Sequence, residues 1–193
     1  MNLTGKKTGM ILILGSVQYI IALIIAEALY PGYSIADNFI SDLGVGQTAL
    51  IFNISIILFG IIVIIASFIL YRNSHNLPFG ILLFLSGAGA AMVGLFPLYW
   101  GIVHDISAAT AFIAGGLAAL ISYRHTESPF CWISIILGAI SLGSLVFFIS
   151  ELYMGIGPGG MERMIVYPIV LWLICYGGYL AAGVRLNQTS IHE

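Results

Sequence analysis

Between Pro31 and Thr48 the sequence reads PGYSIADNFISDLGVGQT. This segment joins two long apolar runs, and it contains acidic and amide side chains but no Lys or Arg. It also contains the bulky apolar residues Phe39, Ile40 and Leu43, which a loop surrounded by water does not need. The combination predicts a segment that lies at a membrane surface or dips back between helices. There it would cap a polar site on one face of a helical bundle.

The composition of the whole chain predicts an integral membrane protein. Of its 193 residues, 60% are hydrophobic and only 7% are charged, and the mean hydropathy is +1.08. A soluble domain has about 25% charged residues. Backbone groups in lipid must be satisfied within their own segment, which favours helices. We therefore expect an all-α, multi-pass protein of the cell membrane, with residues 1–193 forming a single domain and no nucleic acid as partner.

Six apolar runs are long enough to cross a bilayer, which takes about 20 helical residues. They cover Gly9–Leu29, Ala49–Tyr71, Pro78–Pro97, Ile102–Tyr123, Phe130–Ser150 and Arg163–Val184. All basic residues except Arg163 fall on one side of this arrangement, namely Lys6, Lys7, Arg72, Arg124 and Arg185. Because positive charge marks the cytoplasmic side, both termini are predicted to be cytoplasmic.

The sequence also contains an internal similarity. Residues 52–55 (FNIS) recur as residues 104–107 (HDIS), and the Tyr-Arg pair at 71–72 recurs at 123–124. The second and third spans are thus predicted to be a hairpin duplicated as the fourth and fifth spans, in the same orientation. Under this interpretation Asn53 and Asp105 are equivalent positions near the outer face.

Acidic residues gather at the opposite end from the basic ones, at Glu27, Asp37, Asp42, Asp105, Glu151 and Glu162. Ionised carboxylates beside apolar helices are costly, so they share protons, bind a cation or disperse into water. Asp42, Asp105 and Glu151 are expected to converge, and Glu151 should point into the bundle because it continues a stripe of small residues. Glu27, Asp37 and Glu162 could instead be dispersed.

The candidate site combines these acids with polar neighbours. His104, Asp105 and Asp42 are the catalytic candidates, and Asn38, Ser41, Asn53, Glu151, Glu162 and Arg163 are the candidates for ligand binding. Alternatively, Asp105 caps the first helical turn and His104 bonds to a loop carbonyl. No cofactor is identified from the sequence; a divalent metal is an open alternative, since carboxylates suit Mg²⁺ or Ca²⁺ and a histidine admits Zn²⁺ or Mn²⁺.

A glycine-rich segment precedes the last span and reads GIGPGGMER over residues 155–163. A helix N-terminus with an adjacent arginine attracts anions, so a lipid phosphate or a carboxylate could bind there. The alternative is a flexible turn in which Arg163 pairs with Glu162 or with one of the other acids.

Three motifs carry a resemblance to a known family: residues 38–44 (NFISDLG), residues 94–97 (GLFP) followed by His104, and the glycine-rich segment ending in Glu162 and Arg163. Together they resemble the prokaryotic membrane family catalogued as domain of unknown function 998, over nearly the whole chain. The resemblance implies the fold and a membrane location. Residues 40–44 (ISDLG) are also similar to the six-span Frag1/DRAM/Sfk1 proteins, some of which are tied to membrane lipid organisation.

Three functions remain open from the sequence. The leading hypothesis is an outward-facing pocket that binds, or also processes, a lipid head group, with membrane lipids as partners and Arg163 contacting phosphate. The second is a small-molecule or ion-coupled transporter that uses Asn53, Asp105 and Glu151. The third is a structural or assembly protein whose acids are simply solvated. The sequence predicts neither an enzymatic reaction nor an oligomeric state.

Overall fold

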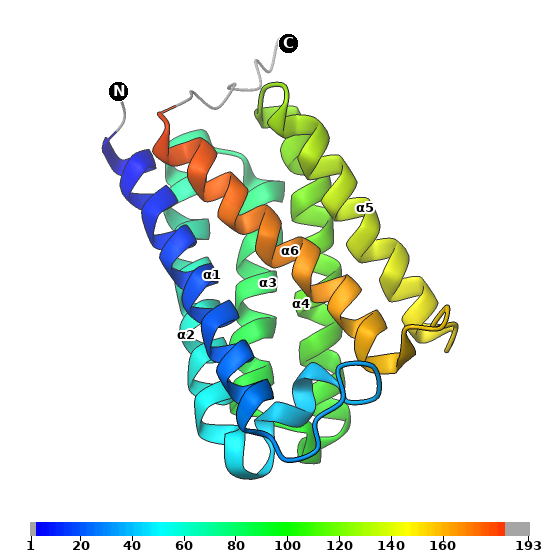
Figure 1. Ribbon diagram of the computed structural model, residues 1–193. Helices are drawn as coiled ribbons and strands as arrows, with labels where there is room; N and C mark the ends of the chain where they lie inside the picture. Colours follow the sequence, from blue (N-terminus) through cyan, green and yellow to red (C-terminus); the bar gives the residue numbers. More distant parts are fainter. Residues whose placement is uncertain (1–2, 184–193) are drawn as a thin grey trace.

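The computed structural model describes residues 3–183, which form a helical bundle (Figure 1). Its long helices are α1 (Leu3–Leu29), α2 (Ala49–Ser74), α3 (Leu77–Leu95), α4 (Ile102–Ile121), α5 (Phe130–Ile149) and α6 (Gly157–Ala181). Short 3-10 helices lie between them, namely η1 (Ile40–Gly44), η2 (Gly46–Thr48), η3 (Leu98–Trp100) and η4 (Ser122–His125). The prediction of an all-α protein with six membrane-spanning segments is confirmed, since six helices are long and apolar enough to cross a membrane.

The sixth span begins earlier than the sequence predicted. The prediction started it at Arg163, whereas α6 starts at Gly157, because the glycines there were taken for a loop. Pro158 is compatible with a first helical turn, and the glycines are used for contact with another segment. Arg185 and the predicted end of the span, Val184, lie outside the described residues.

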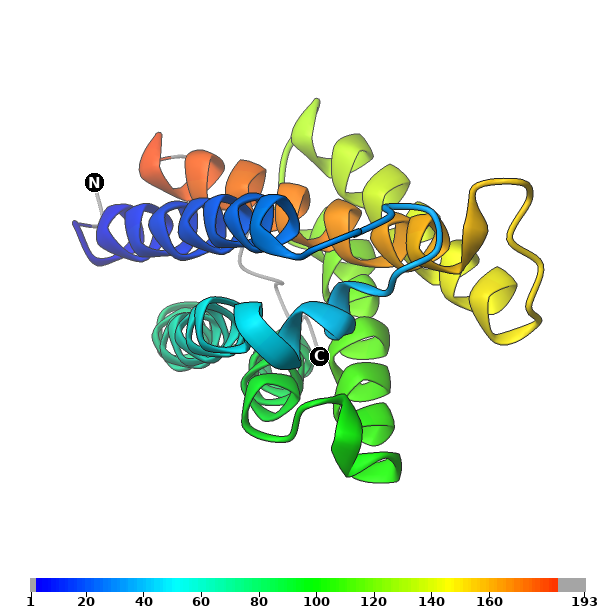
Figure 2. The same cartoon turned by 60° about the horizontal axis from the view of Figure 1, so that its bottom comes forward.

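The helices pack in chain order as a ring, in which each contacts the next and α6 returns to α1. Helix α4 also contacts α6, so α5 lies outside the closed part of the ring (Figure 2). Both ends of the described chain lie at the same end of the bundle, as six spans require (Figure 1). We call this the inner end and the end carrying residues 30–48 the outer end. The orientation in the membrane stays a prediction from the basic residues.

Close helix contacts depend on glycine. At Gly60 in α2 an added Cβ would lie 2.4 Å from the carbonyl oxygen of Gly87 in α3, and at Gly138 in α5 it would lie 2.9 Å from that of Gly116 in α4. Small residues allow helix backbones to approach each other in lipid, where no hydrophobic effect drives association. The two hairpins α2–α3 and α4–α5 run in the same direction, as the predicted duplication requires (Figure 1).

The segment between α1 and α2 folds back over the outer end of the bundle. Figure 2 shows it leaving α1, reaching α6 and returning to α2 by way of η1 and η2. Within it, Ile40 and Leu43 are almost fully buried, which explains why the segment carries bulky apolar side chains. The predicted capping position of this segment is therefore observed.

The inner half of the bundle is filled with aromatic side chains. Phe79 packs edge-on against Trp172 and Tyr176, and Phe130 stacks on Tyr176 and Tyr179. Trp172 and Tyr176 are almost completely buried, and the Trp172 indole N–H donates a hydrogen bond to the Ser134 hydroxyl. This packing leaves the outer half as the place for a cavity.

Candidate functional site

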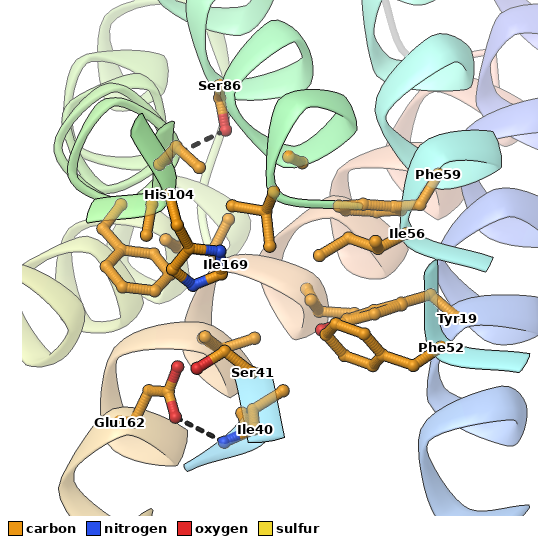
Figure 3. A pocket seen from close by; sticks show the side chains of 17 residues that line it. Tyr19, Ile40, Ser41, Phe52, Ile56, Phe59, Ser86, His104, Glu162 and Ile169 are labelled. Carbon is orange, nitrogen blue, oxygen red and sulfur yellow. Dashed lines mark hydrogen bonds between the residues drawn. The ribbon is translucent and has the colours of Figure 1, made fainter. Parts of the chain in front are cut away.

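A cavity of about 50 Å³ lies under the capping segment in the outer half of the bundle (Figure 3). Its walls come from α1, α2, α3, α4 and α6, and η1 covers it. Most of the lining is apolar, with Phe52, Ile56 and Phe59 on one side and Val166 and Ile169 on another. Polar groups gather at the end next to η1, where Ser41, His104 and Glu162 line the cavity.

His104 enters the cavity from the first turn of α4. The preceding chain turns sharply through Pro97, η3 and Gly101, whose φ of 54° favours glycine. This turn brings the carbonyl of Phe96 to 2.9 Å from His104 Nδ1. Because a carbonyl oxygen only accepts, Nδ1 must carry the proton. In the neutral imidazole, Nε2 is then an acceptor, and the ring, which is 4% exposed, lines the cavity.

Ser41 lies in η1, directly above the cavity. Its residue is 7% exposed, and its hydroxyl forms no hydrogen bond with any residue between 3 and 183. The side chain lies on the same side of the cavity as the Glu162 carboxyl group (Figure 3). A hydroxyl in this position can donate to a ligand or accept from one.

Glu162 comes from the second turn of α6 and is 7% exposed. Its Oε2 accepts a hydrogen bond of 2.5 Å from the backbone N–H of Ile40 in η1. The other carboxyl oxygen, Oε1, has no hydrogen-bond partner within the described part of the chain. The residue thus both holds the capping segment and presents an oxygen to the cavity (Figure 3).

Arg163, the next residue, faces away from the cavity and binds the capping segment. Its NH1 donates to the carbonyl oxygens of Ile35, Asn38 and Gly159, at 3.1, 3.2 and 2.8 Å. Its NH2 lies 2.6 Å from Glu27 Oε1, in an ion pair whose side chains are 6% and 15% exposed. The guanidinium group therefore joins α1, α6 and the segment between α1 and α2.

Tyr33 completes this junction. Its hydroxyl donates to the Phe39 carbonyl at 3.0 Å and accepts from Arg163 NH2 at 2.5 Å. Burial raises the pKa of Tyr33 to about 12, more than the hydrogen bond and positive charge of Arg163 lower it. The phenol therefore stays neutral and can donate its hydrogen bond to the Phe39 carbonyl.

The glycines at the start of α6 contact the same segment. The N–H of Gly159 donates to the Ala36 carbonyl at 2.8 Å. A Cβ at Gly159 would lie 2.0 Å from the Asn38 carbonyl oxygen, and one at Gly157 would lie 2.2 Å from that of Ala36. The helix N-terminus predicted to attract an anion is thus covered by backbone carbonyls.

Asn38 and Asp42 stabilise the capping segment from within, and Asn53 binds it from α2. Asp42 Oδ2 accepts from the Phe39 N–H at 2.9 Å and from Asn38 Nδ2 at 3.1 Å. Asn53 Nδ2 donates to the Gly44 carbonyl at 3.1 Å, while its Oδ1 is buried without a partner in the structure's described residues. None of the three lines the cavity.

The expected convergence of Asp42, Asp105 and Glu151 is not observed. Asp105 and Glu151 are both exposed and lie outside the cavity lining. The expectation that Glu151 points into the bundle was wrong because α5 ends at Ile149, and Glu151 leaves the helical path with a φ of 55°. Among residues 3–183, no three His, Cys, Asp or Glu side chains lie close enough together to hold a metal ion.

Two of the three acids that could have dispersed into water are instead held inside the structure, whereas the third, Asp37, is exposed. Glu162, which was also a candidate for ligand binding, lines the cavity, and Glu27, which was not, pairs with Arg163. Sequence analysis also missed Tyr33 and Ser86, whose hydroxyls bond across the junction and the cavity wall. One signal pointed to Glu27, since it is an acid at the end of an apolar span and Arg163 was the only basic residue predicted on that side.

Comparison with known proteins gives one match. The family model described as "Protein of unknown function (DUF998)" matches residues 13–179, which include four spans in full, most of the first and last spans, and every cavity-lining residue. No curated protein and no solved structure matches the chain, so the similarity to the Frag1/DRAM/Sfk1 proteins stays a prediction. The fold, its six apolar helices and this match together show that the chain is an integral, multi-pass membrane protein that belongs to the DUF998 family.

Proposed function

We propose that the protein binds an amphipathic, lipid-type ligand in the cavity under its capping segment, in the cell membrane. The polar head of the ligand lies against Ser41, His104 and Glu162, and its apolar part lies along the walls formed by α2, α3 and α6. The observation that supports this is the division of one cavity into a polar end with unpaired groups and an otherwise apolar lining. Ligand pockets typically combine apolar walls with a few placed polar groups.

The size of the cavity is suited to a small head group. A single water occupies about 10–15 Å³ on this measure, so about 50 Å³ holds a few atoms of a head group. The rest of a lipid chain would pass between helices toward the surrounding bilayer. A binding role therefore needs no large movement of the bundle for the head group itself.

The aromatic packing of the inner half favours binding over transport. A transported solute must pass polar groups on both sides of the membrane centre. Phe79, Trp172 and Tyr176 instead fill the space below the cavity with buried rings. In this conformation the cavity ends inside the bundle.

Native mass spectrometry of gently extracted protein tests the proposal. We expect the wild-type protein to retain a lipid-type ligand and His104→Asn to retain about tenfold less, because one lost hydrogen bond to a buried group is worth about that factor. Asparagine keeps a donor for the Phe96 carbonyl but has no equivalent of Nε2. The matched control is His75→Asn, since His75 is exposed at the inner end and its left-handed φ of 53° suits asparagine.

A second variant separates binding from folding. Ser41→Ala removes a hydroxyl that has no protein partner within residues 3–183, so the melting temperature should not fall, while ligand retention should. If the wild-type protein retains nothing, or if Ser41→Ala and His104→Asn retain as much as wild type, the proposal is overturned.

A further inference from the structure

We infer that the ligand's head group is a hydrogen-bond donor, and that a single-chain primary amine is the preferred class over phosphate- or carboxylate-headed lipids. This inference rests on the proposed function and adds the chemistry of the head group to it. It follows from which atoms the polar end of the cavity leaves unpaired.

The unpaired atoms at the polar end are mainly acceptors. His104 donates its Nδ1 proton to the Phe96 carbonyl, so a neutral imidazole ring offers a ligand only the Nε2 lone pair. An ionised Glu162 has no proton to donate, and Ile40 occupies only its Oε2. The hydroxyls of Ser41 and Tyr19, which both line the cavity, can donate as well as accept. A ligand that brings hydrogen-bond donors satisfies Ser41, His104 and Glu162 at once.

An anionic head group meets no positive charge here. No Lys or Arg of the described residues 3–183 lines the cavity. Arg163, which follows Glu162 directly in the sequence, already donates hydrogen bonds to five oxygen atoms. These belong to Glu27, Tyr33, Ile35, Asn38 and Gly159. A phosphate at the polar end would lie beside the Glu162 carboxyl group, and like charges at short range in a site of low dielectric repel strongly.

A primary ammonium group matches the polar end of the cavity in its number of hydrogen-bond donors and in its charge. It carries three N–H donors, and Ser41, His104 and Glu162 each offer at least one acceptor. Its charge would also compensate the Glu162 carboxylate, whose ionisation between apolar helices is otherwise costly. An alcohol supplies a donor without the charge, and it should bind more weakly than the amine but more tightly than an anion.

The experiment measures binding of four probes with the same chain to the full-length protein in zwitterionic nanodiscs. The probes are decylamine, decanol, decanoate and decyl phosphate, and native mass spectrometry counts the bound molecules. We expect the amine to bind at least about tenfold more tightly than either anion, because a charge-assisted hydrogen bond in a buried site contributes about that factor. The alcohol should fall between them.

Glu162→Gln identifies the site of this preference. Glutamine keeps an oxygen for the Ile40 N–H and replaces the free carboxyl oxygen with an amide donor. We expect the preference for the amine over decyl phosphate to fall about tenfold in this variant. The control is Glu151→Gln, the same chemical change at an exposed residue of the outer end, which should leave the preference unchanged.

The outcomes separate this inference from the proposed function. If decanoate or decyl phosphate binds as tightly as the amine, and His104→Asn weakens that binding, the head-group inference fails while the cavity remains a binding site. The inference also fails if Glu162→Gln and Glu151→Gln reduce amine binding equally, because the preference would then be a surface charge effect. If no probe binds and no lipid is retained, the proposed function fails as well.

Discussion

At the scale of single residues, adjacent side chains in α6 have different tasks. Glu162 faces the cavity, whereas Arg163 faces the junction of α1 with the capping segment. Successive residues on a helix point about 100° apart, which follows from 3.6 residues per turn. One dipeptide can therefore contribute both to a binding site and to the structure that covers it.

The ion pair of Arg163 leads to a prediction about stability. Arg163→Ala leaves the partly buried Glu27 carboxylate unpaired and frees three backbone carbonyls, so we expect a loss of about 3–5 kcal/mol in unfolding free energy. Thermal unfolding in detergent measures the change. Arg72→Ala, at an exposed arginine near the inner end, is the control and should be close to neutral. Equal melting temperatures for both variants would rule out this role.

Sequence analysis named Arg163 as important and left two interpretations open, a phosphate contact or a pair with one of the outer acids; the structure shows the pair, with Glu27. Residue type was enough to single it out, since it is the only basic residue predicted at the outer end. Which acid and which carbonyl oxygens it binds could not be predicted, because Glu27 and Ile35 are separated from it by more than 120 positions in the chain. Only the return of α6 to α1 brings them together.

At the scale of elements, the contact between the capping segment and the start of α6 decides whether the cavity is covered. This contact joins Gly159 to Ala36, Glu162 to Ile40, and Arg163 to Asn38. It depends on glycines at positions 157 and 159, where backbone meets backbone. The glycine-rich segment therefore works as a docking surface for the protein's own chain.

Gly159→Ala should release the capping segment from α6. The new Cβ would lie 2.0 Å from the Asn38 carbonyl oxygen, so the segment must move away and lose hydrogen bonds. We expect a lower melting temperature and faster proteolysis between residues 30 and 48. Gly178→Ala in the same helix has open space around it and should stabilise the protein by about 0.5–1 kcal/mol. Identical protease resistance in the two variants would contradict the docking role.

At the scale of the whole molecule, the inner half of the bundle is packed with aromatic rings and the outer half contains the cavity. The aromatic cluster and the cavity share the α3 and α6 walls, so one ring of helices supports both. The asymmetry of the basic residues then predicts on which side of the membrane the cavity opens. The cavity should face the extracytoplasmic side.

Cysteine labelling tests this orientation. In a background with Cys131→Ala and Cys175→Ala, we expect Gln47→Cys to react with a membrane-impermeant maleimide in intact cells. Asn73→Cys, exposed at the end of α2 near the inner end, should react only after lysis. The positive-inside rule gives this expectation, because Arg72 lies beside Asn73. The opposite labelling pattern would place the cavity on the cytoplasmic side.

The sequence by itself determined the class, the number of spans and most of their boundaries. Hydrophobicity is a local property, and a run of about 20 apolar residues has one stable form in lipid. It also pointed to residues 31–48 as a cap and to His104 and Ser41 as site residues. Only the tertiary structure decided which acids take part. Glu162, already a binding candidate, and Glu27 take part, whereas Asp105 and Glu151 do not, because the packing of α6 against α1 and the capping segment depends on contacts between residues far apart in the chain.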